Sequence, residues 1–454
     1  MSVKVIASVV IVAAVAAVGG SYVTGSQVEE GFREKLTETF KPASGITVQV
    51  VEYDRGIFGA TARTQWSLSP AGKSSEVSFT VNHKITHGPL PAVSAFARIR
   101  SEPELPNEVA SFVKSKFGDT PLLVIDSTLG WSGKVSHHFA VPKYEGDEPG
   151  LGKVSWKGVE GDIALSDHGN RIQARIDVPG LSISEKNNNI QIDNIVLEGE
   201  QSRTQQYRSI WVGSSAMEIN KVAINLNDAP PFGLDTLKVT SNAVLKGEVF
   251  DASVGLSAAR LQVLGETVEQ TGLTYGLENM DAAAFDKLMH AIEELQPNLD
   301  EQTVLPLLLE QVPALLERKP AFVLRDIRAK FAEGEAKGDL RIAYVGAGKV
   351  DEFNPTTDLV GELHFSLPHA LITRLAAEKL QQEVVEEEED DDGDEVINFE
   401  EQIEQQIAVL VDIGLLEKNN GTLSISASFK DGTFGLNGKT LTVEEAMELL
   451  QSLD

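Results

Sequence analysis

An acidic segment near residue 390 has the residue types and the spacing of a calcium-binding loop. Acids occupy every second position from 388 to 394, namely Glu388, Asp390, Asp392 and Asp394. An EF-hand loop needs oxygen ligands at positions 1, 3, 5 and 7, glycine at position 6 and glutamate at position 12. Gly393 fits position 6, but Phe399 occupies position 12. The segment is therefore either a site for a divalent ion or a solvated, self-repelling linker, and we favour the linker.

His87 is the second candidate, because Gly88 and Pro89 follow it at the end of an alternating segment. An imidazole at a rigid turn could act as a general base or as a metal ligand. The sequence offers it no identifiable acid or nucleophile as a partner, and a Gly-Pro pair is enough to end a strand. We interpret His87 as part of a structural turn.

The other candidate histidines do not form a metal-binding pattern. His137 and His138 are adjacent in an expected strand, so their side chains should point to opposite faces. His364 and His369 flank a strand end and a helix start, at a spacing that fits no zinc site. We expect neither a metal nor another cofactor.

Catalytic motifs are also missing from the sequence. It contains no Gly-x-Ser-x-Gly elbow and no His-Glu-x-x-His segment. Residues 346–349 (GAGK) lack the following Ser or Thr of a phosphate loop, because Val350 stands there. Thiol catalysis is excluded, since the chain has no cysteine. These absences predict a protein that is not an enzyme.

Four tryptophans each lie in or beside an expected strand. Such aromatic residues usually belong to a core, and an aromatic-lined ligand groove is the alternative. The four are Trp66, Trp131, Trp156 and Trp211.

Composition narrows the possible partners. The chain has 454 residues, 42% of them hydrophobic, and a net charge of −29. This charge argues against binding of nucleic acid, whose phosphates would be repelled. It also argues against a broad electrostatic attraction to an anionic membrane surface.

The first residues predict delivery to a membrane. Residues 5–18 (VIASVVIVAAVAAV) are apolar apart from Ser8, and only Lys4 precedes them. With residues 19–23 the stretch is long enough to span a bilayer, and the lysine keeps the amino terminus cytoplasmic. We expect an uncleaved, single-pass anchor, with a cleaved signal peptide as the alternative. The apolar residues of this anchor are Val5, Ile6, Val9, Val10, Ile11, Val12, Val15 and Val18.

Period-two alternation with β-branched residues dominates residues 45–264, as in residues 76–81 (EVSFTV) and 171–176 (RIQARI). Such alternation predicts strands with one face in water, and the short Gly, Asn and Pro links between them favour antiparallel meanders. Helical periodicity appears later, over residues 281–295, 301–318, 368–382, 399–416 and 443–453. Pro313 should kink or split the second of these helices. The fold class is therefore α+β, dominated by antiparallel sheet, with one N-terminal membrane helix.

These elements suggest five regions along the chain. They are an anchor (1–26), a β-rich domain (27–270), a helix pair with strands (271–382), an acidic linker or insertion (383–397) and a closing helix-strand-strand-helix segment (398–454).

The order of features resembles the YdgA family of bacterial envelope proteins, whose domain has no known function. The resemblance rests on the N-terminal apolar segment, residues 51–58 (VEYDRGIF), residues 85–91 (ITHGPLP) and residues 424–439 near the end. Within it, His87, Gly88 and Pro89 form the most specific motif. The resemblance implies a protein anchored in the inner membrane and facing the periplasm of a Gram-negative bacterium. It implies no activity and supplies no catalytic residues.

Three functional hypotheses follow. The first is a membrane-tethered periplasmic scaffold or interaction module that binds envelope proteins or a second copy of itself through its sheet. The second is a carrier of lipid or another apolar ligand, which requires a continuous apolar surface of more than a few hundred Å². The third is a hydrolase with a site assembled only in three dimensions, with His87 at its centre.

Overall fold

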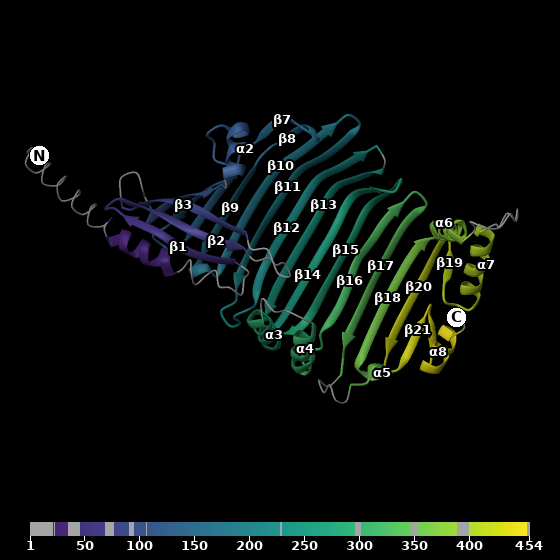
Figure 1. Cartoon of the computed structure of the whole chain (residues 1–454). Coiled ribbons are helices and arrows are strands. Elements are labelled where there is room, and N and C mark those ends of the chain that lie inside the picture. Colours follow the sequence, from purple (N-terminus) through teal and green to yellow (C-terminus); the bar gives the residue numbers. More distant parts are fainter. Residues whose placement is uncertain are drawn as a thin grey trace, which may run out of the picture. The chain divides into compact units, whose positions relative to one another are not determined.

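The structure of the protein is a computed structural model. It describes residues 21, 23–34, 46–68, 77–89, 95–105, 107–227, 229–295, 301–346, 353–387 and 399–451. Antiparallel strands dominate it, and helices are concentrated in the second half, which confirms the α+β class dominated by antiparallel sheet (Figure 1). The chain divides into two compact units, unit 1 (Met1–Met217 and Asp286–Leu307) and unit 2 (Glu218–Phe285 and Leu308–Asp454).

Unit 1 contains eleven of the described strands and one helix that lie wholly within it, besides the helical residues 23–34. The strands are β1 (Ile46–Arg55), β2 (Gly59–Leu68), β3 (Val77–His87), β4 (Ala97–Glu104), β5 (Val124–Leu129), β6 (Val135–Val141), β7 (Tyr144–Glu148), β8 (Gly152–Trp156), β9 (Val159–Ser166), β10 (Arg171–Glu185) and β11 (Asn188–Arg203), and the helix is α2 (Asn107–Phe117). The strands pair antiparallel in the order β1-β2-β3-β4-β5-β6-β9-β10-β11, and β8 also pairs with β10 and carries β7 on its other edge.

Unit 2 is built in the same way. Its strands are β13 (Ala229–Lys246), β14 (Val249–Val263), β15 (Glu266–Asp281), β16 (Ala321–Phe331), β17 (Gly334–Tyr344), β18 (Leu359–Pro368), β19 (Glu417–Asn419), β20 (Thr422–Lys430), β21 (Thr433–Leu436) and β22 (Lys439–Leu441), and its helices are α5 (Pro355–Asp358), α6 (His369–Glu387), α7 (Phe399–Asp412) and α8 (Val443–Gln451). Strand β12 (Trp211–Leu226) and helices α3 (Ala282–Leu295) and α4 (Glu301–Leu316) contribute residues to both units.

Two local predictions have clear outcomes. Helix α8 begins with the predicted capping box, because the Thr442 amide donates to Glu445 Oε2 (2.8 Å) and the Glu445 amide donates to Thr442 Oγ1 (3.2 Å). The expected split at Pro313 is wrong, since α4 continues to Leu316 as one helix. Pro313 lies three residues before that end, so that only the last turn of the helix follows the proline.

The helix over residues 23–34 lies against the first strands of unit 1 (Figure 1). Val28 is buried against Ala60, Ala62 and Ile85, and Phe32 packs at the edge of the same cluster. A narrow core of this kind needs small residues on the strands, because the helix must approach the sheet closely. The helix is therefore fixed to β2 and β3.

No helix in the described part of the chain is long and apolar enough to cross a membrane. The predicted anchor, residues 5–18, lies outside the described residues, as does the acidic segment 388–394.

Candidate functional site

The sheet of unit 2 carries an extended apolar surface on one face. Two rows of directly paired residues cross eight strands, β13 to β18 with β20 and β21, and adjacent rows lie two residues apart along each strand. One row is Ser241, Val254, Tyr275, Leu324, Leu340, Leu363, Ala427 and Leu436; the other is Ala243, Ala252, Leu277, Phe322, Ile342, Gly361, Phe429 and Phe434. Paired residues of an antiparallel ladder share a face, so these sixteen residues form one surface, which we call the apolar face. It contains two hydroxyl groups, on Ser241 and Tyr275, and no charge.

The opposite face of the same strands is polar. The intervening row is Asn242, Ser253, Gly276, Val323, Arg341, Glu362, Ser428 and Gly435. Glu278 on this side forms ion pairs with Arg325 and Arg341. These side-chain hydrogen bonds and charges outweigh burial, and they lower the pKa of the Glu278 carboxyl. The sheet thus separates an apolar face from one that carries polar and charged side chains.

The apolar face is not closed into a core. None of its sixteen residues is buried, and Tyr275, Leu277, Phe322 and Ile342 are between 39 and 47% exposed. Each row crosses eight strands, and the seven spacings of about 4.8 Å between neighbouring strands give the row a length of roughly 34 Å. A strip of that length and about 10 Å width covers roughly 340 Å², within the range of the largest apolar patch on a typical monomer. Exposed patches of this size commonly mark binding sites.

Helices lie at two opposite corners of this face. At one corner Phe285 of α3 stacks on Phe250 of β14, with ring centroids 4.8 Å apart. At the other, Ile403 and Ile407 of α7 are buried against Leu423 of β20. Ion pairs from Arg374 to Glu333 (2.6 Å) and Glu266 (3.0 Å) join α6 to the neighbouring strands. The helices therefore border the apolar face, and the exposed side chains lie between them, on β15, β16 and β17.

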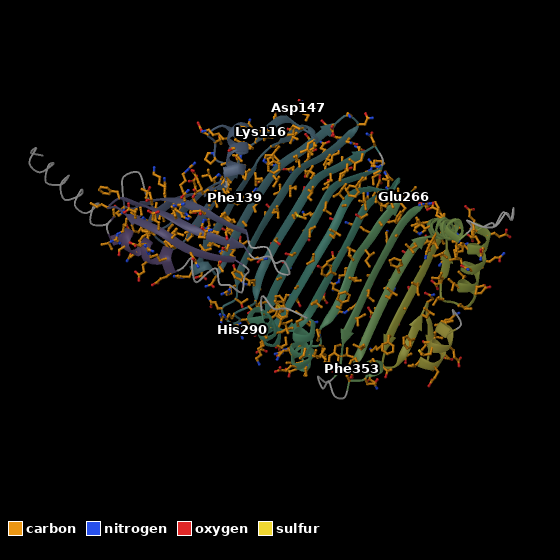
Figure 2. The ribbon with its side chains drawn as sticks, in the orientation of Figure 1. Lys116, Phe139, Asp147, Glu266, His290 and Phe353 are labelled. Atoms are coloured by element: carbon orange, nitrogen blue, oxygen red, sulfur yellow. The ribbon has the colours of Figure 1, made fainter. Side chains whose placement is uncertain are left out.

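Unit 1 has the same division into two faces. One row of paired residues crosses nine strands and is mostly apolar: Tyr53, Ala62, His83, Ser101, Ile125, Phe139, Gly161, Ile176 and Leu197. Phe139, labelled in Figure 2, lies over Gly161, since a methyl group there would come within 2.2 Å of its ring. The adjacent row carries ion pairs, among them Arg175 with Glu198 (2.9 Å). The helix over residues 23–34 covers the apolar row at Ala62.

His83 is the one buried polar ring in that row with a defined set of partners. Its Nε2 lies 2.8 Å from Thr64 Oγ1, and its Nδ1 lies 2.8 Å from Ser101 Oγ. The Trp66 indole also donates to Thr64 Oγ1 (2.8 Å), and Phe32 packs edge-on against the imidazole. Burial lowers the pKa of His83 to about 4, so the ring is neutral at pH 7. No carboxylate is among these partners, and the arrangement is that of a structural network rather than a catalytic triad.

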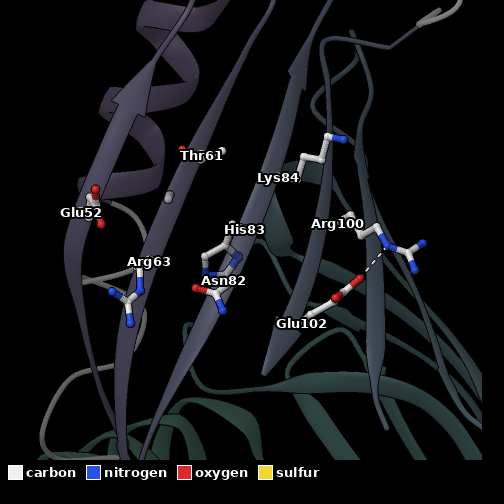
Figure 3. Close-up of a pocket in the computed structure, with 9 residues that line it drawn as sticks. Glu52, Thr61, Arg63, Asn82, His83, Lys84, Arg100 and Glu102 are labelled. Atoms are coloured by element: carbon white, nitrogen blue, oxygen red, sulfur yellow. Dashed lines mark hydrogen bonds and ion pairs between the residues drawn. The ribbon is translucent and has the colours of Figure 1, made fainter. Parts of the chain in front are cut away.

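A shallow pocket lies on the polar side of the same strands (Figure 3). Its charged lining residues are Glu52, Arg63, Lys84, Arg100 and Glu102. Arg100 pairs with Glu102 (2.9 Å), and Arg63 pairs with Glu104 (2.9 Å). These are exposed, mutually compensated ion pairs, which are typical of a solvated surface.

His87 is fully buried beside the helix that follows the predicted anchor. A methyl group on Gly25 of that helix would lie 2.6 Å from His87 Nδ1. Thr24 of the same helix donates to the carbonyl of Gly88. The complete burial of His87 supports the interpretation of His87, Gly88 and Pro89 as a structural turn, and it argues against a role for this ring as an exposed base.

Gly88→Ala should lower the free energy of unfolding by about 3 kcal/mol, because overpacking against fixed backbone costs energy of that order. The added methyl group would lie 2.0 Å from the carbonyl oxygen of Ala95. Urea unfolding followed by tryptophan fluorescence measures the change. The matched control is Gly31→Ala in the helix over residues 23–34, where nothing lies within 4 Å of the new atom. That control should be neutral or stabilising by about 0.5–1 kcal/mol, and wild-type stability of Gly88→Ala would contradict the account.

The remaining predicted residues have separate partners. His137 is 2.8 Å from Ser127 Oγ, whereas His138 is 3.0 Å from Asp162 on the other face, as predicted. His364 contacts Ser426 (3.2 Å), and His369 contacts Glu404 (2.9 Å). Within the described ranges, no three His, Asp or Glu side chains are gathered closely enough to hold a metal ion.

The tryptophans do not line a common groove. Trp66 stacks on Phe79, Trp131 meets Phe96 edge-on, Trp156 pairs in register with Leu181, and Trp211 lies under the Arg203 guanidinium. The apolar face, by contrast, was not identified residue by residue from the sequence. The sequence signal for the apolar face is the alternation of apolar residues within each strand. The register of strand pairing decides which of these residues lie side by side on the face.

A family model described as "Bacterial protein of unknown function (DUF945)" matches residues 2–444. The chain is also similar to the "Uncharacterized protein YihF" of Escherichia coli (strain K12), at 20% identity over 94% of each chain. No solved structure matches. Neither of the two matches bears the name YdgA, so that narrower resemblance stays a prediction.

Proposed function

The chain belongs to the DUF945 family of bacterial proteins of unknown function, and from this premise we propose that it is a periplasmic carrier of lipid, tethered to the inner membrane. Its ligands are the acyl chains of a lipid or a similarly long apolar molecule. The apolar faces of its sheets hold them. The observation that carries the proposal is the pair of apolar rows across eight strands of unit 2, in which no residue is buried and four large apolar side chains are exposed.

The chemistry of the apolar face suits an aliphatic chain. Its residues are mostly Leu, Val, Ile, Phe and Ala, and hydrogen-bond donors are almost absent. A ligand that needs directed polar contacts would find none, whereas an acyl chain gains about 0.8 kcal/mol for each buried CH₂ group. The length of roughly 34 Å is about twice the length of the acyl chains of one lipid, which span half of the roughly 30 Å hydrocarbon core of a bilayer. A whole lipid therefore has room to lie along the face.

The position of the first helix supports an origin of the ligand in the membrane. Residues 5–18 are expected to lie in the bilayer, and the helix that follows them packs on the apolar side of β2 and β3. The apolar row of unit 1 continues from there to Leu197 of β11. Lipid leaving the membrane would meet an apolar surface beside its point of exit.

In-cell photo-crosslinking tests this proposal. Benzoylphenylalanine at Phe322, on the apolar face, should form adducts of lipid mass. The same group at Ser428, on the polar face of the same sheet, should not. Adducts with protein alone at Phe322 would favour the interaction-module hypothesis, and the absence of adducts at both positions would overturn the carrier proposal.

A further inference from the structure

Four large apolar side chains are exposed at one end of the strands of unit 1. They are Val23 (56% exposed), Ile57 (49%), Phe58 (46%) and Trp131 (56%). Ile57 and Phe58 form the β1–β2 turn, Trp131 lies in the β5–β6 turn, and Val23 lies at the start of the helix over residues 23–34. We call these four residues the tip patch.

A chain of contacts connects the elements that carry the tip patch. The His87 amide donates to the Phe58 carbonyl (3.0 Å), and the Gly88 amide donates to the Phe96 carbonyl (2.9 Å). The Phe96 amide in turn donates to the Leu129 carbonyl (2.8 Å), directly before the turn that holds Trp131. Both turns are thus fixed at the same end of the sheet.

The helix joins this end of the sheet as well. Thr24, next to Val23, donates to the Gly88 carbonyl, and the ring of Phe96 meets that of Trp131 at 5.3 Å. The four exposed side chains therefore belong to one end of one compact unit, and they are held there by backbone hydrogen bonds.

The same end lies next to the predicted anchor. Val18, the last residue of the apolar segment, precedes Ser21 by three residues, which can span at most about 11 Å. When residues 5–18 lie in a bilayer, the start of the helix, and with it the tip patch, must be close to the lipid surface.

The chemistry of the two turns suits that position. Residues 56–59 (GIFG) and 130–134 (GWSGK) contain no acid, and the second segment ends in a lysine, although the chain as a whole carries a net charge of −29. Tryptophan and other large apolar residues are favoured at the membrane interface, where the ring is only partly dehydrated. Turns without acids reduce the repulsion that the rest of the chain would meet at an anionic leaflet.

We propose that the tip patch inserts into the interfacial layer of the membrane that holds the anchor, and that it fixes unit 1 in a defined orientation on that membrane. The inference rests on the membrane anchoring proposed above. It adds a second, peripheral contact, made by Ile57, Phe58 and Trp131. This contact would hold the apolar row of unit 1 beside the lipid.

The absence of cysteine in the natural chain allows a direct test with the full-length protein. The single-cysteine variants Ile57→Cys and Trp131→Cys each carry one environment-sensitive nitrobenzoxadiazole label. Each labelled protein is reconstituted in phosphatidylethanolamine–phosphatidylglycerol vesicles that contain spin-labelled phosphatidylcholine. The control is Asp119→Cys, at an exposed site after α2, at the opposite end of β4 and β5. Labels at 57 and 131 should shift to the blue and lose most of their emission to the spin label, whereas the label at 119 should stay bright.

Each other result overturns the inference in a distinguishable way. Protein that floats with the vesicles but shows equally bright labels at all three positions is anchored without contact of the tip patch. Labels at 57 and 131 that shift to the blue without quenching are covered by protein rather than lipid. Protein that fails to float contradicts the anchor itself, and the inference fails with it.

Discussion

The double substitution Leu277→Asp with Ile342→Asp should weaken binding of an acyl-labelled phospholipid by at least about tenfold, because each change removes apolar contact area and places a charge against the chain. The two positions lie in one row of the apolar face, two strands apart, and both side chains are about 40% exposed. The substitutions therefore change the surface without opening a buried core. Titration of the purified protein with a phospholipid bearing an acyl-chain fluorophore measures the effect.

The matched control adds the same charge to the other face. Asn242→Asp with Ser428→Asp lies in the polar row of the same sheet, and both positions are exposed. This variant should bind the labelled lipid as the wild type does. Equal loss of binding in both variants would mean that net charge, and not the apolar face, determines affinity.

Acidification should destabilise unit 1 through His83, by roughly 3 kcal/mol between pH 7 and pH 4. The folded-state pKa of His83 is about 4, whereas the ordinary value is 6.5, because burial disfavours the charged ring. A depressed pKa means that the unfolded chain binds the proton more readily than the folded one. The stabilisation is therefore complete above pH 6.5 and is lost as the pH falls through 4.

The His83→Gln variant isolates this contribution. It should be less stable than the wild type at pH 7, because Thr64 and Ser101 lose a partner, but its stability should fall less steeply towards pH 4. All four tryptophans belong to unit 1, so tryptophan fluorescence in urea reports on this unit. Parallel pH curves for the wild type and His83→Gln would contradict the proposed role of burial.

Much of the architecture could be predicted from the sequence. The alternation in residues 171–176 predicts a strand with one apolar face, and β10 has that strand. The capping box at Thr442 predicts the start of α8 to the residue. Helix α2 was missed, although Val109, Val113 and Phe117 have helical spacing, because strand-like alternation dominates the chain around it.

The candidate site could not be predicted in the same way. The alternation changes phase within β10, with Ile176 at an even position and Leu181 at an odd one. The change occurs at Gly180, with φ of +151°, which pairs with Asp193, next to the positive-φ residue Asn194. Residue parity alone therefore does not tell which apolar residues share a face. Many similar strands also permit many registers, and only the three-dimensional pairing aligns Leu277, Phe322 and Ile342.

Native mass spectrometry of the full-length protein, released gently from bacterial membranes, tests the central claim most directly. We predict a population that carries additional mass equal to that of one or more lipids, and that is strongly reduced in the Leu277→Asp/Ile342→Asp variant. A bare chain mass in the wild type, whether monomeric or dimeric, would contradict the carrier function and favour a protein-binding role for the sheet.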